Sequence, residues 1–267
     1  MSLLVRAPAA NASGVVTDVT PHSAGWTHVG FRVVRLAAGQ VHHGCEAGRE
    51  ACVVVLTGTV SIDAGAERLT SLGMRDSVFD GEAAAVYLPA GTDYAITAER
   101  DAEVAICTAP GSRGGTARVL PAGTIETRGA GTNVRHVRNI LSDSDDLAES
   151  LLVVEVVTPG GHWSSYPPHK HDRDAYPDET LLEETYYHRL SPPQGFAFQR
   201  VYTDDRSIDE TMTVQDGDVV LVPRGYHPVG AAHGYDLYYL NVMAGPRRKW
   251  VFANDPAHDW IMRQPKG

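Results

Sequence analysis

The sequence predicts an all-β protein built from two tandem β-barrels or β-sandwiches. Apolar runs along the 267 residues are short and bounded by Gly, Pro, Asp and Asn, and helical periodicity is weak. The order of the runs in the first half returns in the second, which predicts two copies of one β unit. A parallel sheet would need crossover helices, and the sequence shows no pattern for them.

In the first half, the apolar runs read in order as strands. Residues 50–58 and 59–62 lie on either side of a glycine, which predicts a strand, a tight turn and a second strand. The runs that predict strands in this half are 26–36, 51–62, 83–89 and 95–107.

A stretch rich in Gly, Ser, Thr, Arg and Pro at 109–138 predicts a connection between the units. We place the boundary there, with 1–128 as the first barrel and 129–267 as the second. The runs that predict strands in the second half are 150–158, 184–188, 195–202 and 216–223. Short helical turns are expected at 143–152 and 255–262.

Charge and cysteine content exclude several classes of protein. The formal charge is −10, from 23 Lys and Arg against 33 Asp and Glu, and this argues against a nucleic-acid partner. Three cysteines without CxxC spacing indicate neither a disulfide framework nor a zinc ribbon. Because no run approaches the ~20 apolar residues of a membrane span or forms a signal peptide, we expect a cytoplasmic protein without a membrane partner.

Histidines of the second half have the spacing of a metal site. His169 and His171 are one residue apart, so on a strand both imidazoles point to one face. A glutamate of a neighbouring strand, Glu183 or Glu184, and His227 in the Pro-x-Gly-x-His segment would complete a shell with open positions. A His-x-His pair alone is more often a surface or core pair, and the added glutamate and third histidine favour the metal site.

This order of motifs, with Asn241 downstream, resembles the two motifs of the cupin superfamily, whose members are jelly-roll β-barrels. The resemblance implies four ligands for one divalent metal: His169, His171, Glu184 and His227. Glu184 is chosen over Glu183 because the following Tyr-Tyr-His resembles the strand after the cupin glutamate. The insertion at 172–182 departs from the usual cupin pattern.

The first half follows the same order without a complete set of ligands. His42, His43 and Glu50 occupy the corresponding positions, but His-x-His is absent, and Asp or Tyr replaces the last histidine. We expect these residues to be polar groups of a barrel without a metal.

Longer blocks of the second half resemble one cupin family, the 5-deoxy-glucuronate isomerases of myo-inositol catabolism. The blocks are 131–138 (GTNVRHVR), 160–172 (GGHWSSYPPHKHD), 183–189 (EETYYHR), 192–206 (PPQGFAFQRVYTDDR) and 223–229 (PRGYHPV). The resemblance implies an aldose–ketose isomerase that converts 5-deoxy-D-glucuronate to 5-dehydro-2-deoxy-D-gluconate without a redox cofactor. The alternatives are a related uronate ketol-isomerase of pectin breakdown, an iron dioxygenase and a non-catalytic sugar-acid-binding cupin.

Isomerisation of an aldose develops negative charge on two neighbouring oxygens, which a divalent metal can chelate. Zinc is the first choice for the metal, and manganese, iron, cobalt and nickel also suit the ligand set. Three residues of the ligand strand are candidates for a catalytic base: Glu183, Tyr186 and His188. Glu183 should face away from the metal if Glu184 faces it.

The carboxylate of a sugar-acid substrate calls for an arginine, whose planar fork matches it. Arg200 is the first candidate, because it lies on a predicted strand, with Arg189 and Arg224 as alternatives. Four further residues are expected to line the pocket: Tyr166, Lys170, Tyr202 and Tyr226. We expect a dimer or larger assembly, since jelly rolls leave sheet edges and faces that often pair.

Overall fold

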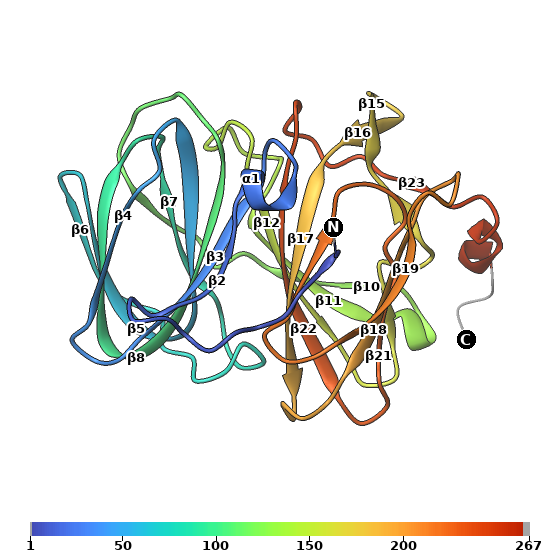
Figure 1. Cartoon of the computed structure of the whole chain (residues 1–267), viewed down its shortest axis with the longest axis horizontal. Helices are drawn as coiled ribbons and strands as arrows, with labels where there is room; N and C mark the ends of the chain where they lie inside the picture. The colour runs from blue at the N-terminus through green and yellow to red at the C-terminus, as the bar shows by residue number, and fades with distance from the viewer. Residues whose placement is uncertain (1, 264–267) are drawn as a thin grey trace. The chain divides into compact units, whose positions relative to one another are not determined.

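The computed structural model describes residues 2–263, and it is all-β, as predicted (Figure 1). In these residues the regular structure besides the strands is α1 (Pro21–Ala24) and two 3-10 helices, η1 (Gly131–Asn133) and η2 (Asp259–Arg263). Across the same range, no helix combines the length and the apolar content that crossing a membrane would require.

The chain divides into two compact units. The N-terminal unit comprises Ala7–Gly123 and Ile140–Val153, and the C-terminal unit comprises the described residues of the rest of the chain. The expected boundary was at 128/129. Instead, residues 2–6 and 124–128 belong to the C-terminal unit, and residues 140–153 belong to the N-terminal unit. Pairing explains two of these exchanges: β1 (Leu4–Val5) pairs with β20 (Val219–Val222), and β10 (Ile125–Arg128) pairs with β11 (Arg135–Leu141).

The N-terminal unit is a single antiparallel sheet that closes around an apolar interior. Its strands are β2 (Val15–Val19), β3 (Gly30–Leu36), β4 (Val41–Cys45), β5 (Arg49–Ala64), β6 (Glu67–Leu72), β7 (Ala84–Leu88), β8 (Asp93–Pro110) and β9 (Arg118–Leu120). Val53, Val55, Ile62, Val86 and Ile96 fill the interior. These aliphatic side chains offer no ligand atom to a metal.

The predicted strand, turn and second strand at 50–62 are wrong, because β5 runs through Gly58 as one strand. Its pairing with β8 shifts register on either side of Gly58, whose φ is 88°. A Cβ at this position would lie 2.3 Å from the carbonyl oxygen of Asp101. The glycine therefore permits a β-bulge and a close approach of the neighbouring strand.

The C-terminal unit holds a seven-stranded sheet, a four-stranded sheet and two short strand pairs. The seven-stranded sheet has the order β1-β20-β17-β22-β12-β11-β10, where β12 is Leu152–Thr158, β17 is Glu183–Ser191 and β22 is Asp236–Ala244. The four-stranded sheet has the order β13-β21-β18-β19, formed by Trp163–Ser164, Val229–Ala231, Ala197–Tyr202 and Asp209–Val214.

The two short pairs lie around the predicted metal motif. β14 (His169–Lys170) pairs with β23 (Ala253–Asn254). The insertion between His171 and the glutamate forms the hairpin β15 (Asp172–Ala175) and β16 (Glu179–Leu181). This hairpin returns the chain to the start of β17, so the insertion does not separate His171 from Glu184 in space.

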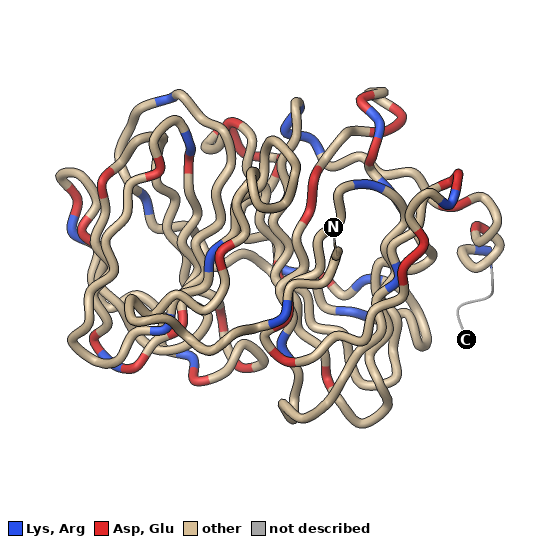
Figure 2. Tube along the Cα trace, viewed as in Figure 1, with Lys and Arg blue, Asp and Glu red and all other residues tan. Residues whose placement is uncertain are grey.

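The helical turn predicted at 143–152 does not form. The backbone N–H groups of Glu149, Ser150 and Leu151 instead donate to the carboxylate of Glu50, at 2.7–2.8 Å. These donors are therefore unavailable to a helix, and the segment forms turns before β12. Charged residues of both signs are interspersed along the chain (Figure 2), so the net charge of −10 is not gathered in one segment.

Candidate active site

Three buried side chains of the C-terminal unit converge on one point. They are His171, which follows β14, Glu184 of β17, and His227, which precedes β21; their donor atoms lie within 4.8 Å of one another. Glu184 Oε2 is 3.0 Å from His171 Nε2 and 3.3 Å from His227 Nε2. Within residues 2–263 this is the one such group of His, Cys, Asp or Glu side chains.

Backbone carbonyls orient the two imidazoles. His171 Nδ1 lies 3.0 Å from the Leu182 carbonyl oxygen, and His227 Nδ1 lies 2.8 Å from that of Gly225. When each Nδ1 carries the proton and donates it to the carbonyl, the Nε2 lone pairs point toward Glu184. His227 Nε2 is buried without a hydrogen-bond partner. Two imidazole nitrogens and a carboxylate are a donor set that fits a divalent first-row metal.

The environments of the two histidines shift their pKa values in opposite directions. Burial lowers the pKa of His227 to about 4, so its imidazole is neutral at pH 7, the form that binds metals. Burial acts on His171 as well, but the hydrogen bond to Glu184 and the negative charge of this carboxylate raise the pKa of His171.

His169, the fourth predicted ligand, lies beside this group rather than in it. Its ring centroid is 4.9 Å from that of His227 and 6.4 Å from that of His171. Its ring also packs against Phe252, with 4.6 Å between centroids. His169 is therefore a neighbour of the group and not one of the three side chains whose donor atoms converge.

Two tyrosines pack behind the group. Tyr186 of β17 lies 5.7 Å from His227 and 4.9 Å from Tyr239 of β22, measured between ring centroids. The Tyr186 hydroxyl is hydrogen-bonded to Ser165 Oγ at 2.9 Å, and the Tyr239 hydroxyl is hydrogen-bonded to Ser164 Oγ. Burial raises the pKa of Tyr239 to about 12, so its hydroxyl stays protonated. The hydrogen bond to Ser165 holds the Tyr186 ring in place, and this ring packs against the His227 imidazole.

His188 also lies on the inner face of β17, but it is fully buried. Its Nε2 is 2.9 Å from Gln199 Oε1, and the amide of Gln199 donates to the His227 carbonyl oxygen at 3.5 Å. Burial lowers the pKa of His188 to about 4. His188 is placed to hold Gln199, and through it the backbone at His227.

His169, the neighbour of the three-residue group, lines a cavity of about 480 Å³. The loop 128–133 and the side chains of Arg135, Tyr166, His169 and Phe252 line it. This volume falls in the range of small-molecule sites. Polar and aromatic groups thus share one cavity with a predicted metal ligand.

Of the predicted substrate-binding residues, the structure brings Tyr166 to this cavity. Arg200 forms two hydrogen bonds of 2.8 Å with Asp209, and Arg189 donates to Asp216 at 2.9 Å. Neither arginine lines the cavity, because each lies on a strand face that points away from it.

The remaining predicted pocket residues have structural partners. The ammonium of Lys170 lies between the carboxylates of Asp172 and Glu179. The two tyrosine hydroxyls donate to carboxylates at 2.8 Å, Tyr202 to Asp255 and Tyr226 to Asp204. Glu183 precedes Glu184 on β17, so its side chain lies on the opposite face of the strand.

Two residues of this region were not predicted from the sequence. Tyr239 lies two positions before Asn241 on β22, so the period of two places both on the inner face, and this pattern could have identified it. Arg135 lies in the block 131–138, but its position in a cavity depends on the fold.

In the N-terminal unit, Glu50 has a structural role. Besides the three backbone N–H groups, its carboxylate accepts a hydrogen bond of 2.8 Å from the Tyr87 hydroxyl, and its side chain is fully buried. Each of the two carboxylate oxygens thus accepts two hydrogen bonds from residues of this unit.

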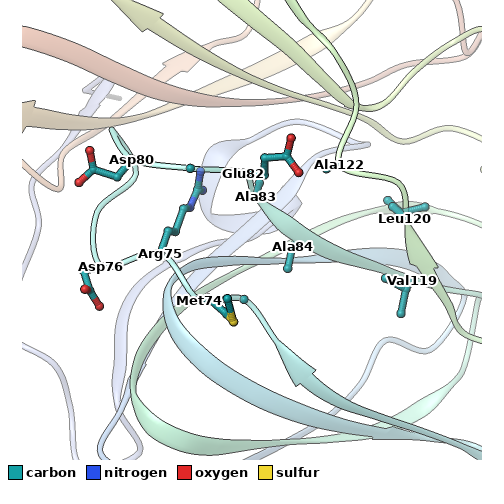
Figure 3. A pocket seen from close by; sticks show the side chains of 12 residues that line it. Met74, Arg75, Asp76, Asp80, Glu82, Ala83, Ala84, Val119, Leu120 and Ala122 are labelled. Carbon is teal, nitrogen blue, oxygen red and sulfur yellow. The ribbon is translucent and has the colours of Figure 1, made fainter.

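This unit also has a cavity of about 660 Å³, larger than the one in the C-terminal unit (Figure 3). Arg75, Asp76, Asp80 and Glu82 contribute its charged groups. Arg75 Nε donates to the Leu56 carbonyl oxygen at 2.9 Å. Its carboxylates do not belong to the convergent group of metal-ligating side chains found in residues 2–263.

The profile of the KduI/IolB family matches residues 3–261, nearly the whole chain. The chain belongs to the KduI/IolB family. This membership confirms the resemblance found in the sequence.

Curated relatives and solved structures agree with the family assignment. The chain is 54% identical over 263 residues to the 5-deoxy-glucuronate isomerase of Geobacillus kaustophilus, covering 97% of the chain and 95% of the relative. It is 50% identical over 271 residues to the 5-deoxy-glucuronate isomerase of Bacillus subtilis (strain 168), covering 99% and 100%. The crystal structure of an IolB-like protein from Salmonella typhimurium LT2 has a TM-score of 0.94 at 49% identity, covering 98% of this chain and 100% of that one.

A more distant structure supports the fold alone. Oxalate decarboxylase from Bacillus subtilis has a TM-score of 0.63 at 14% identity, covering 93% of this family member and 76% of the decarboxylase. The predicted fold of two tandem cupin barrels is confirmed.

Proposed function

We propose that this protein is a metal-dependent 5-deoxy-glucuronate isomerase whose active site lies in the C-terminal unit. It converts 5-deoxy-D-glucuronate to 5-dehydro-2-deoxy-D-gluconate. The observation that carries the proposal is the convergence of His171, Glu184 and His227, in a chain that aligns nearly end to end with relatives of that name. The adjacent His169 lines a cavity of about 480 Å³.

His171, Glu184 and His227 would hold the divalent metal, with His169 as the fourth ligand. When bound, the metal supplies Lewis-acid polarisation of the vicinal oxygens of the sugar. Zinc is the first choice for this ion. With His171, Glu184 and His227 as protein ligands, a bound metal would keep a position for water or a substrate oxygen.

The other residues position these groups and exclude water. Tyr186 packs against the His227 imidazole, and the His188–Gln199 pair holds the backbone of His227. Phe252 and Tyr166 give the cavity aromatic walls, which strengthen polar interactions with the substrate by excluding water. Glu183, Tyr186 and His188 do not line the cavity, so we give Tyr186 and His188 positioning roles and assign no base among these three.

Substitution of one ligand tests the proposal. We expect His171→Ala to lose both bound metal, measured by elemental analysis, and conversion of 5-deoxy-D-glucuronate, followed by proton NMR. His233→Ala is the matched control, because His233 is an exposed histidine of the same unit. A His171→Ala variant with wild-type turnover and no metal would refute the proposal. Bound metal without turnover in the wild type would favour a related uronate ketol-isomerase or a dioxygenase.

A further inference from the structure

One arginine of the cavity carries a charge that no carboxylate of residues 2–263 neutralises. Arg135, the first residue of β11, forms one hydrogen bond, from Nη1 to the Asn133 carbonyl oxygen at 3.2 Å. The other arginine of the cavity, Arg128, is paired with the carboxylate of Glu126 at 2.7 Å. Two arginines thus line one cavity, and one of them is available to an anion.

Arg135 is also partly desolvated. Burial lowers the pKa of this guanidinium, which nevertheless stays protonated in a protein. A cation that loses hydration without gaining a counter-ion is unfavourable, and an anionic ligand in the cavity would remove that cost.

We propose that Arg135 binds the carboxylate of the substrate and selects sugar acids over neutral sugars. This inference rests on the proposed function. Arg135 and His169 line the same cavity, so a linear sugar acid can place its aldehyde end near the metal group and its carboxylate at Arg135. The hydrogen bond to Asn133 holds one edge of the guanidinium and leaves donors for a bidentate carboxylate.

Substrate discrimination tests the assignment. The ratio of kcat/KM for 5-deoxy-D-glucuronate to kcat/KM for the neutral 5-deoxy-D-glucose is measured for wild type and Arg135→Gln. We expect Arg135→Gln to lose about 10- to 100-fold in kcat/KM for the acid, mainly through KM, as for a lost charged hydrogen-bond pair. The kcat/KM for the neutral sugar should change less than about threefold on the same reasoning, because no charged pair is lost there.

Two variants control for structural effects. Arg135→Lys keeps the charge without the fork and should recover part of the discrimination. Arg206→Gln removes an exposed arginine of the same unit and should leave the ratio unchanged. If Arg135→Gln keeps the wild-type ratio, the assignment is overturned while the proposed function stands.

Binding gives a readout that does not depend on turnover. Calorimetry with D-glucuronate and D-glucose on the metal-free chain should show a preference for the acid that Arg135→Gln abolishes. If the wild type converts neither sugar, the proposed function fails, and this binding preference then decides on Arg135 alone. Equal binding by wild type and variant, or no binding of D-glucuronate by the wild type, overturns the assignment.

Discussion

The Glu50 carboxylate organises the N-terminal unit, and its replacement by glutamine should destabilise that unit strongly. Oε1 accepts from the N–H groups of Ser150 and Leu151, and Oε2 accepts from the N–H of Glu149 and the hydroxyl of Tyr87. A glutamine keeps one accepting oxygen, so its NH₂ group must face two donors.

The size of the effect follows from these contacts. Two hydrogen bonds to a charged acceptor are lost, each worth about 1.5–3 kcal/mol, and their donors are left unsatisfied in a buried site. We expect Glu50→Gln to lower the free energy of unfolding by about 3–5 kcal/mol. Rotation of the Tyr87 hydroxyl to donate elsewhere would place the value at the lower end.

Urea denaturation of Glu50→Gln, followed by circular dichroism, measures this loss. Glu67→Gln is the control, because Glu67 is exposed on β6 and should change the stability by less than about 0.5 kcal/mol. A loss below about 1 kcal/mol for Glu50→Gln would mean that the carboxylate does not organise residues 149–151 and would refute this reasoning.

Two further predictions concern His188 and Gly58. Because burial lowers the pKa of His188 to about 4, its folded form stays neutral while the unfolded chain takes up a proton below pH 6.5. Stability should therefore fall by about 3 kcal/mol between pH 6.5 and pH 4 from this residue, and urea titrations of His188→Phe should lack that share of the loss. Gly58→Ala should lower the free energy of unfolding by about 2 kcal/mol or more, because its Cβ would lie against Asp101 at a φ of 88°. Gly65→Ala, whose Cβ would have no atom of residues 2–263 within 4 Å apart from its chain neighbours, should lower it by about 1 kcal/mol. Equal thermal shifts for the two variants would contradict this prediction.

Local pattern predicted strands that are marked by apolar runs, such as β8, β12 and β17, and it missed others, among them β2, β19 and β22. The period of two places His169 and His171 on one side of the chain, and the apolar run 216–223 contains β20. Gly58 was misjudged because the same residue suits a turn and a bulge, and only the partner strand decides between them.

The arginines show where sequence reasoning ends. Arg200 was favoured for the substrate because a charge on a strand needs a partner, and that partner is Asp209 on the adjacent strand β19. The sequence does not identify Arg135, because the absence of a carboxylate partner beside it depends on the folded cavity. Ion pairing is set by tertiary contacts, so no local pattern distinguishes a paired arginine from an available one.

Metal titration of the metal-free protein tests the central claim most directly. The initial rate of conversion of 5-deoxy-D-glucuronate, followed by proton NMR, is measured against equivalents of added divalent metal. Because residues 2–263 hold one such ligand group, the rate should rise linearly and level off at about one equivalent. Full activity before any metal is added, or a rate that keeps rising to two equivalents, would contradict a single metal centre at His171, Glu184 and His227.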